Sequence, residues 1–125
     1  MKICVTSEGK TLDSRVDPRF GRCRNFIFFD TKTGDFEAQE NTNAQFQGGA
    51  GIQSAQLVAS NQVKAVLTGD VGPNAFQTLQ AAGIVVFTGA AGSVKEAIEK
   101  YKKGGFTAVS GPSVVSHSGK QEMKK

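Results

Sequence analysis

The sequence has few of the residues that metal cages, disulfide frameworks and nucleic-acid surfaces usually require. Its 125 residues include no tryptophan, one tyrosine, one histidine and two cysteines, Cys4 and Cys23. Two cysteines cannot form a disulfide framework or the four-thiolate cage of a zinc ribbon or an iron–sulfur cluster. No stripe of basic residues is interleaved with aromatic ones, which disfavours nucleic acid as a partner. Any metal group must therefore be held by few thiolates, or largely by electrostatics.

Long apolar runs are also missing. No run approaches the roughly 20 residues of a membrane span, and the N-terminal residues lack the pattern of a signal peptide. We therefore expect a cytoplasmic protein without a membrane partner. The net charge of +4 and the hydrophobic share of 38% suit a basic globular protein, with an anionic partner as the main alternative to a merely solvated surface. The length fits one α/β domain over residues 1–110, followed by a flexible, polar, basic tail over 111–125 that contains His117.

Hydrophobic patterning predicts the element order β-β-β-α-β-α-β-α. Four consecutive apolar residues, Phe26 to Phe29, indicate a strand that is buried on both faces. Ile52, Ala55 and Ala59 form one apolar stripe of the first predicted helix. Ser93 and Glu96 predict a capping box at the start of the last helix. The simplest arrangement is a five-stranded mixed sheet of order 3-2-1-4-5, with strand 2 antiparallel and helices on its faces. The expected strands are 1–7, 25–31, 36–40 (an edge strand), 63–68 and 84–88; the expected helices begin at Ala50, Pro73 and Val94, and 106–110 is a further short extended segment.

Two glycine-rich turns, 48–51 and 68–72, each precede a predicted helix. The first N–H groups of a helix have no internal acceptor, and the helix dipole adds roughly half a positive charge there. In the predicted topology these turns share one sheet edge with 88–92 and with 15–24, a loop that carries four arginines. Ligands of open α/β sheets bind at such an edge. We therefore expect an anion-binding rim, although glycines at helix starts can be turn chemistry alone and loop arginines can be merely solvated.

Several motifs together resemble a known family. They are Phe20-Gly21-Arg22 before an apolar strand, Gly48-Gly49-Ala50-Gly51, the run from Thr68 to Phe76, and Ala82-Gly83-Ile84. In this order they resemble the dinitrogenase iron–molybdenum cofactor biosynthesis family, over about residues 1–105. The resemblance implies a ribonuclease-H-like fold. It also implies binding, carriage or insertion of an anionic iron–molybdenum or other metal–sulfur cluster, or of its precursor, with a cofactor-assembly or acceptor protein as partner.

One position departs from the pattern of many relatives, which have a histidine before Phe-Gly-Arg where this chain has Arg19. A guanidinium cannot ligate a metal, so the site would be more purely electrostatic. Cys23 is the best soft ligand, because the flanking arginines favour its thiolate. Cys4 is expected in the core, and a Cys4–Cys23 disulfide is disfavoured by separation. Asp70 caps the second helix or binds metal. The candidate contacts are Arg19, Arg22, Arg24, Gly49, Ala50, Gly51, Gly69, Asp70 and Gly72.

Catalytic arrangements are hard to find in this sequence. A nuclease of the ribonuclease-H fold needs clustered carboxylates, one of them on the first strand, whereas the first acid here is Glu8. The sole histidine lies in the tail, so no Ser-His-Asp or Cys-His pattern can be identified. We therefore expect a non-catalytic protein, a monomer or a weak dimer. Two alternatives stay open: a regulatory or scaffold module that recognises a protein, and an enzyme acting on a small phosphorylated or nucleotide substrate.

Overall fold

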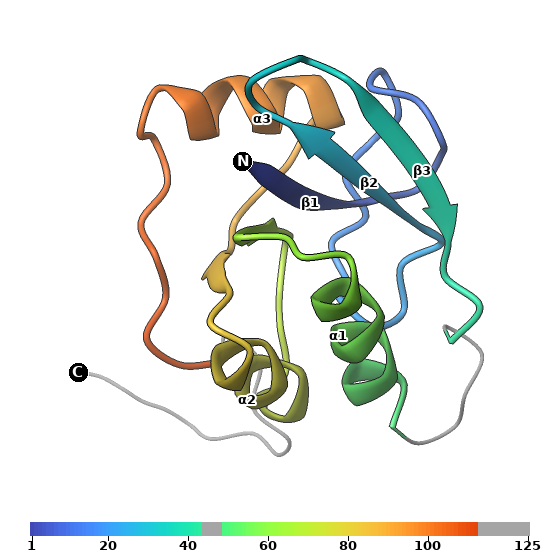
Figure 1. Ribbon diagram of the computed structural model, residues 1–125, viewed down its shortest axis with the longest axis vertical. Helices are drawn as coiled ribbons and strands as arrows, with labels where there is room; N and C mark the ends of the chain where they lie inside the picture. Colours follow the sequence, from blue (N-terminus) through green and yellow to red (C-terminus); the bar gives the residue numbers. More distant parts are fainter. Residues whose placement is uncertain (44–48, 113–125) are drawn as a thin grey trace.

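The computed structural model describes residues 1–43 and 49–112. Five strands and three helices follow one another in the predicted order β-β-β-α-β-α-β-α (Figure 1). Gly48, His117 and most of the expected tail lie outside the described residues. No helix in the described ranges is long and apolar enough to cross a bilayer. The elements are β1 (Lys2–Ser7), β2 (Asn25–Asp30), β3 (Phe36–Glu40), α1 (Ala50–Ser60), β4 (Ala65–Leu67), α2 (Pro73–Ala81), β5 (Val85–Phe87) and α3 (Val94–Lys102).

The sheet has the predicted order β3-β2-β1-β4-β5. β2 is antiparallel to β1 and β3, whereas β1, β4 and β5 are parallel. The α/β architecture and the mixed sheet are therefore confirmed, and the ribonuclease-H-like label stays a prediction. Residues 25–29 of β2 are buried, and β3 is a largely exposed edge, in line with the apolar and polar composition of the two strands.

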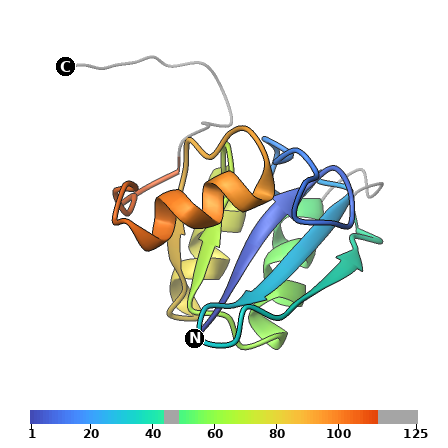
Figure 2. The ribbon, with the colours of Figure 1, turned by 90° about the horizontal axis from the view of Figure 1, so that it is seen from above.

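The helices cover the sheet on both faces (Figures 1 and 2). α1 and α2 pack on the face that carries Phe26 and Phe28, while α3 packs on the face that carries Ile27 and Phe29. Successive strand residues point to opposite faces, so β2 contributes to both cores. Each fully buried large apolar side chain stabilises the fold by about 1.5–3 kcal/mol.

The boundaries of several elements differ from the predictions. β4 and β5 have three residues each, shorter than expected, although Lys64 and Thr68 beyond the ends of β4 still donate backbone hydrogen bonds to neighbouring strands. The segment 106–110 forms only an isolated bridge, between Ala108 and Phe87. The predicted capping box is confirmed: the Glu96 N–H donates to Ser93 Oγ at 3.0 Å, and the Ser93 N–H to Glu96 Oε1 at 2.9 Å.

The buried side of α1 also differs. The sequence pattern placed Ile52, Ala55 and Ala59 on the inner stripe, but the buried residues of this helix are Ala50, Ser54, Ala55 and Val58. Ile52 and Ala59 are only half-buried. The helix is rotated so that Ser54 faces inward, where its hydroxyl donates a hydrogen bond to the Gly21 carbonyl in the loop that follows β1.

Candidate functional site

The arginine-rich loop and the turn after β4 are held together by paired backbone hydrogen bonds. The Asp70 N–H donates to the Pro18 carbonyl at 2.8 Å, and the Phe20 N–H donates to the Asp70 carbonyl at 3.2 Å. Gly69 lies so close to this loop that a Cβ there would be 2.6 Å from Pro18 Cα. Gly69 therefore serves close packing of two backbones.

The other two predicted segments reach the same rim. Gly21 has φ +94°, and a Cβ there would lie 3.0 Å from Gly51 Cα, so the loop touches the first turn of α1. The segment 88–92 is joined by the Gly89 N–H, which donates to the Gly69 carbonyl at 2.9 Å. Each of the four segments that the topology assigned to one sheet edge thus contacts at least one of the others.

A cleft of about 190 Å³ opens at this rim between the starts of α1 and α2. Both helices begin at glycines: Gly49, with φ +76°, and Gly72, in extended conformation. The first N–H groups of each helix lack acceptors within the helix. None of the described residues that line the cleft carries a charge; they are Phe20, Gly49, Gly51, Ile52, Gly72, Pro73, Asn74 and Ala75. The cleft combines helix dipoles with apolar walls, a suitable environment for a soft anion.

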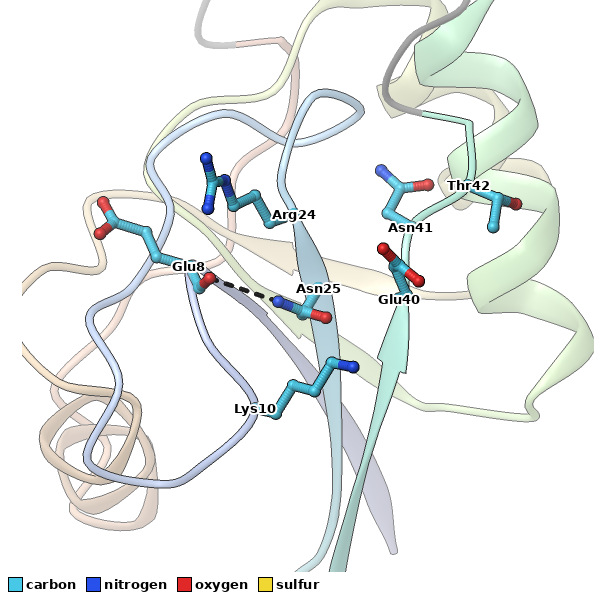
Figure 3. Close-up of a pocket in the computed structure, with 7 residues that line it drawn as sticks. All are labelled: Glu8, Lys10, Arg24, Asn25, Glu40, Asn41 and Thr42. Atoms are coloured by element: carbon cyan, nitrogen blue, oxygen red, sulfur yellow. Dashed lines mark hydrogen bonds between the residues drawn. The ribbon is translucent and has the colours of Figure 1, made fainter.

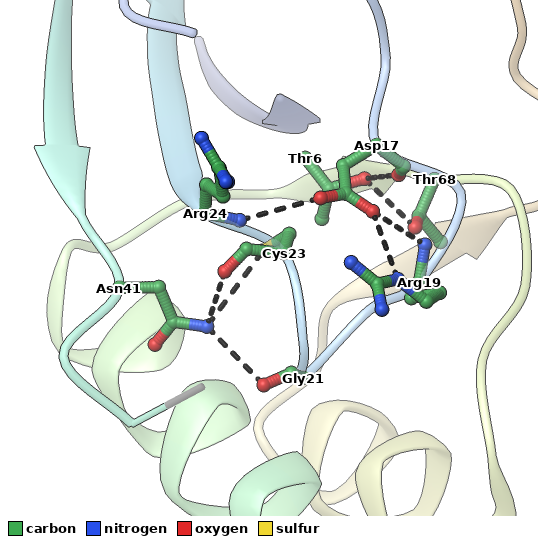
Figure 4. Close-up of polar contacts among 8 residues, drawn as sticks. All are labelled: Thr6, Asp17, Arg19, Gly21, Cys23, Arg24, Asn41 and Thr68. Atoms are coloured by element: carbon green, nitrogen blue, oxygen red, sulfur yellow. Dashed lines mark hydrogen bonds and ion pairs between the residues drawn. The ribbon is translucent and has the colours of Figure 1, made fainter. Parts of the chain in front are cut away.

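Asp17, which sequence reasoning did not single out, organises the arginine loop (Figure 4). Its side chain is 2% exposed and accepts hydrogen bonds from the N–H groups of Arg19 (3.1 Å) and Arg24 (3.3 Å). The Arg19 Nε lies 3.4 Å from Asp17 Oδ1. The Thr6 hydroxyl donates to the Asp17 carbonyl at 2.7 Å and is hydrogen-bonded to the Thr68 hydroxyl at 2.8 Å. The buried Asp17 carboxylate therefore fixes the backbone of the loop that carries the arginines.

The three predicted arginines do not form one wall. All are exposed, and Arg19 is partly neutralised by its ion pair with Asp17. Arg24 lines a second and larger hollow beside β2 and β3 (Figure 3). Arg19 and Arg22 thus stand in the loop that borders the cleft, while the cleft itself is uncharged along its described lining.

Asn41, a second residue that the sequence gave no reason to select, ties the loop to α1. Its buried amide nitrogen donates to the carbonyl groups of Gly21 at 3.2 Å and Cys23 at 3.0 Å. Ser54 Oγ of α1 lies 3.3 Å from both the Gly21 carbonyl and Asn41 Oδ1. These contacts hold the loop against the first half of α1, next to the cleft.

The expectation that Cys23 is a thiolate is wrong. Its side chain is fully buried, and burial, followed by the negative charge of Asp17, raises the pKa of the Cys23 thiol to about 12. The neighbouring arginines expose their side chains and do not offset these effects. Cys4 lies in the core as expected, and burial, followed by the proximity of Cys23, raises its pKa. Both cysteines are free.

The expectation that Asp70 caps the second helix is also wrong. The residue at the N-cap of α2 is Gly72, and no side chain caps this helix. The Asp70 side chain is exposed, and its N–H is engaged with Pro18, so that amide is not available to an anion. Within residues 1–43 and 49–112, no group of three or more His, Cys, Asp or Glu side chains could hold a metal ion.

Comparison with known proteins gives the family. Residues 1–104 match the family model described as dinitrogenase iron–molybdenum cofactor. The chain belongs to this family. It is similar to the apo form of the orange protein from Desulfovibrio gigas, with 42% identity and a TM-score of 0.88 over 90% of this chain and 96% of that one.

Two further proteins are similar to this chain. A protein from Thermotoga, described as a putative NifB protein of the DUF35 family, is 38% identical with a TM-score of 0.76, over 86% of this chain and 91% of that one. An uncharacterized protein of Methanocaldococcus jannaschii is 32% identical over 107 residues, which are 83% of this chain and 87% of the relative. The three similar proteins match between 83% and 90% of this chain.

Proposed function

We propose that this protein binds an anionic metal–sulfur cluster, or its precursor, in the cleft between the starts of α1 and α2. The protein carries this cargo to a cofactor-assembly or acceptor protein and does not transform it. The observation that supports the proposal is the cleft itself, which is lined by the starts of two glycine-initiated helices and by no charged side chain among the described residues.

The chemistry of the cleft suits such a cargo. Each helix start contributes about 0.3–1 kcal/mol to a bound charge, and a cluster with several negative charges interacts with both helices at once. Phe20, Ile52 and Pro73 offer apolar contact to sulfide ligands, and the exposed Arg19 and Arg22 add positive charge in the bordering loop. A carrier without strong metal ligands releases its cargo readily. Ligation by Cys23 stays a prediction that would require the loop to open.

The comparisons support this reading. The family is described by the iron–molybdenum cofactor, and the orange protein, at 42% identity, was solved in an apo form. Contact of Arg24 with the same cargo stays a prediction, because this side chain lines the other hollow.

A negative charge introduced into the cleft by substitution tests whether the cleft binds an anionic cargo.

Asn74 is an exposed residue of the first turn of α2 and lines the cleft. Its replacement by aspartate adds a negative charge where the helix dipole favours one, so the fold is retained. Gln77→Glu adds the same charge at an exposed position of α2 outside the cleft lining. Tetrathiomolybdate is titrated anaerobically into each protein and followed by its absorbance.

A like charge at about 4 Å costs between about 1 and 4 kcal/mol, depending on solvent screening. Asn74→Asp should therefore weaken tetrathiomolybdate binding by about tenfold or more, while Gln77→Glu should change it by less than about threefold. Equal affinities for the two variants, or no binding to the unmodified protein near millimolar ligand, would overturn the proposal.

A further inference from the structure

A second hollow, larger than the cleft, is lined by other residues. It has a volume of about 650 Å³ and is lined by two acids, Glu8 and Glu40, and two bases, Lys10 and Arg24, with Asn25 among them. Asn25 shares a face of the sheet with Ile27, whose side chain packs on the α3 side. The hollow and the cleft between α1 and α2 share no lining residue. This hollow is called the β2–β3 pocket below.

Asn25 carries an unmet hydrogen-bonding requirement. The residue is 6% exposed, and its amide nitrogen donates to the Glu8 carbonyl at 3.3 Å. That bond fixes the orientation of the amide. The Asn25 Oδ1 is then buried without a hydrogen-bond partner among the described residues. Because a buried acceptor without a donor is costly, a group that brings an N–H to this atom would be favoured. Asn25 Oδ1 has almost no exposed surface, so the side chains around it must shift to admit such a group.

The neighbours of Asn25 indicate which N–H group fits. Glu40 is directly opposite Asn25 in the β2–β3 register, and such residues place their Cβ atoms about 4.5–5.5 Å apart on one face. In Figure 3 the Asn25 amide lies between the side chains of Lys10 and Glu40. An ammonium group can therefore donate both to Asn25 Oδ1 and to the Glu40 carboxylate, an arrangement that favours a charged donor.

The basic residues of the pocket provide the opposite charge. The guanidinium of Arg24 can bind a carboxylate through two parallel hydrogen bonds, and the Lys10 ammonium lines the same hollow. A simple anion would face two carboxylates here, and a simple cation would face two bases. The presence of two acidic and two basic side chains favours a ligand that carries both a positive and a negative charge.

We propose that the β2–β3 pocket binds a free α-amino acid, with its ammonium group at Asn25 and Glu40 and its carboxylate at Arg24 and Lys10. This inference does not rest on the proposed cargo function, because the two concavities share no lining residue and need different ligand chemistry.

The test uses nitrogen-15-labelled protein and L-alanine, with two blocked derivatives as matched controls. N-acetyl-L-alanine keeps the carboxylate and lacks the ammonium group, whereas L-alanine methyl ester keeps the ammonium group and lacks the carboxylate. L-alanine should shift the side-chain amide signals of Asn25 and the backbone amides of Glu8 and Glu40. Each blocked derivative should bind about tenfold more weakly or worse, because it loses one charged contact.

A pair of variants tests the position of the ammonium group. Glu40→Gln removes a carboxylate from the pocket at an exposed residue, so the fold is retained; Glu37→Gln removes one from the other face of the same strand. Affinity for L-alanine should fall about tenfold in the first and stay within about twofold in the second. L-glutamate and L-arginine, tested likewise, identify the side-chain charge that the pocket prefers.

The inference is wrong if L-alanine, L-glutamate and L-arginine all leave these amide signals unshifted at about 20 mM, a concentration that would reveal binding in the millimolar range. It is equally wrong if N-acetyl-L-alanine binds as well as L-alanine, which would indicate a simple anion site, or if the two glutamate variants behave alike. None of these results bears on tetrathiomolybdate binding, so the cargo proposal stands or falls separately.

Discussion

Replacement of Gly69 by alanine tests the contact that brings the turn after β4 against the arginine loop. The new Cβ would lie 2.6 Å from Pro18 Cα and 2.7 Å from the Pro18 carbonyl oxygen. Both are backbone atoms, so neither can turn aside as a side chain would. One of the two backbones must shift, and with it the paired hydrogen bonds between Asp70 and its neighbours in the loop.

The size of the effect follows from two opposing contributions. Overpacking of a tight contact lowers the free energy of unfolding by about 1–3 kcal/mol. Alanine also restricts the unfolded chain relative to glycine, which raises the free energy of unfolding by about 0.4–1 kcal/mol. We expect Gly69→Ala to lower the free energy of unfolding by about 1–2 kcal/mol, equivalent to several degrees in Tm. The control is Gly72→Ala: a Cβ there meets no described atom within 4 Å, and the φ of −83° suits alanine.

Gly72→Ala should therefore raise the free energy of unfolding by about 0.4–1 kcal/mol, so the two substitutions should act with opposite signs. Urea unfolding followed by circular dichroism measures both values under the same conditions. If Gly69→Ala is as stable as the unmodified protein, the close approach of Gly69 to Pro18 is not a feature of the molecule.

Three further predictions concern the loop, the thiols and α3. Asp17→Asn should lower the free energy of unfolding by about 1.5–3 kcal/mol, because charge-assisted hydrogen bonds to Arg19 and Arg24 are lost, and urea unfolding measures this. The pKa of the buried Cys23, raised to about 12, means that only the unfolded chain releases this proton between about pH 9 and 12. In this pH range the free energy of unfolding should therefore fall as the pH rises. The fall should be steeper in the unmodified protein than in Cys23→Ser, by about 1.4 kcal/mol per pH unit. Ser93→Ala should cost about 1 kcal/mol of unfolding free energy, measured by thermal unfolding, since it removes the N-cap of α3.

Each of these predictions has an outcome that would contradict it. Unchanged stability of Asp17→Asn would mean that the carboxylate does not hold the loop. Rapid reaction of Cys23 with a thiol reagent in the folded protein near pH 8 would contradict its burial and raised pKa. For α3, a Ser93→Ala variant as stable as Ser93→Thr, which keeps a hydroxyl cap, would show that the capping box contributes nothing.

The fold was largely predictable because its signals are local. The apolar run Phe26–Phe29 predicted the buried strand, the Ser93–Glu96 pair predicted the start of α3, and the sheet order followed from the sequence of elements. Strand ends were less predictable, because neighbouring strands and not propensity decide where a strand stops. The convergence of glycine turns and the arginine loop at one rim followed from topology in the same way.

The details of the site depend on contacts between residues far apart in the chain, which local patterns do not record. Asp17 and Asn41 are ordinary polar loop residues in the sequence, and only the fold buries them. Cys23 has arginine neighbours along the chain, yet its sulfur faces the core and Asp17. Asp70 precedes a helix, but its backbone is committed to Pro18. Sequence adjacency is a poor guide to which charges a buried group meets.

Mapping tetrathiomolybdate on the nitrogen-15-labelled protein under anaerobic conditions shows whether an anion of this kind occupies the cleft between α1 and α2. We predict that the largest amide shifts fall on Gly51 and Ile52 of α1 and on Asn74 and Ala75 of α2. Shifts confined to residues outside this cleft, or an unchanged spectrum near millimolar ligand, would contradict the account.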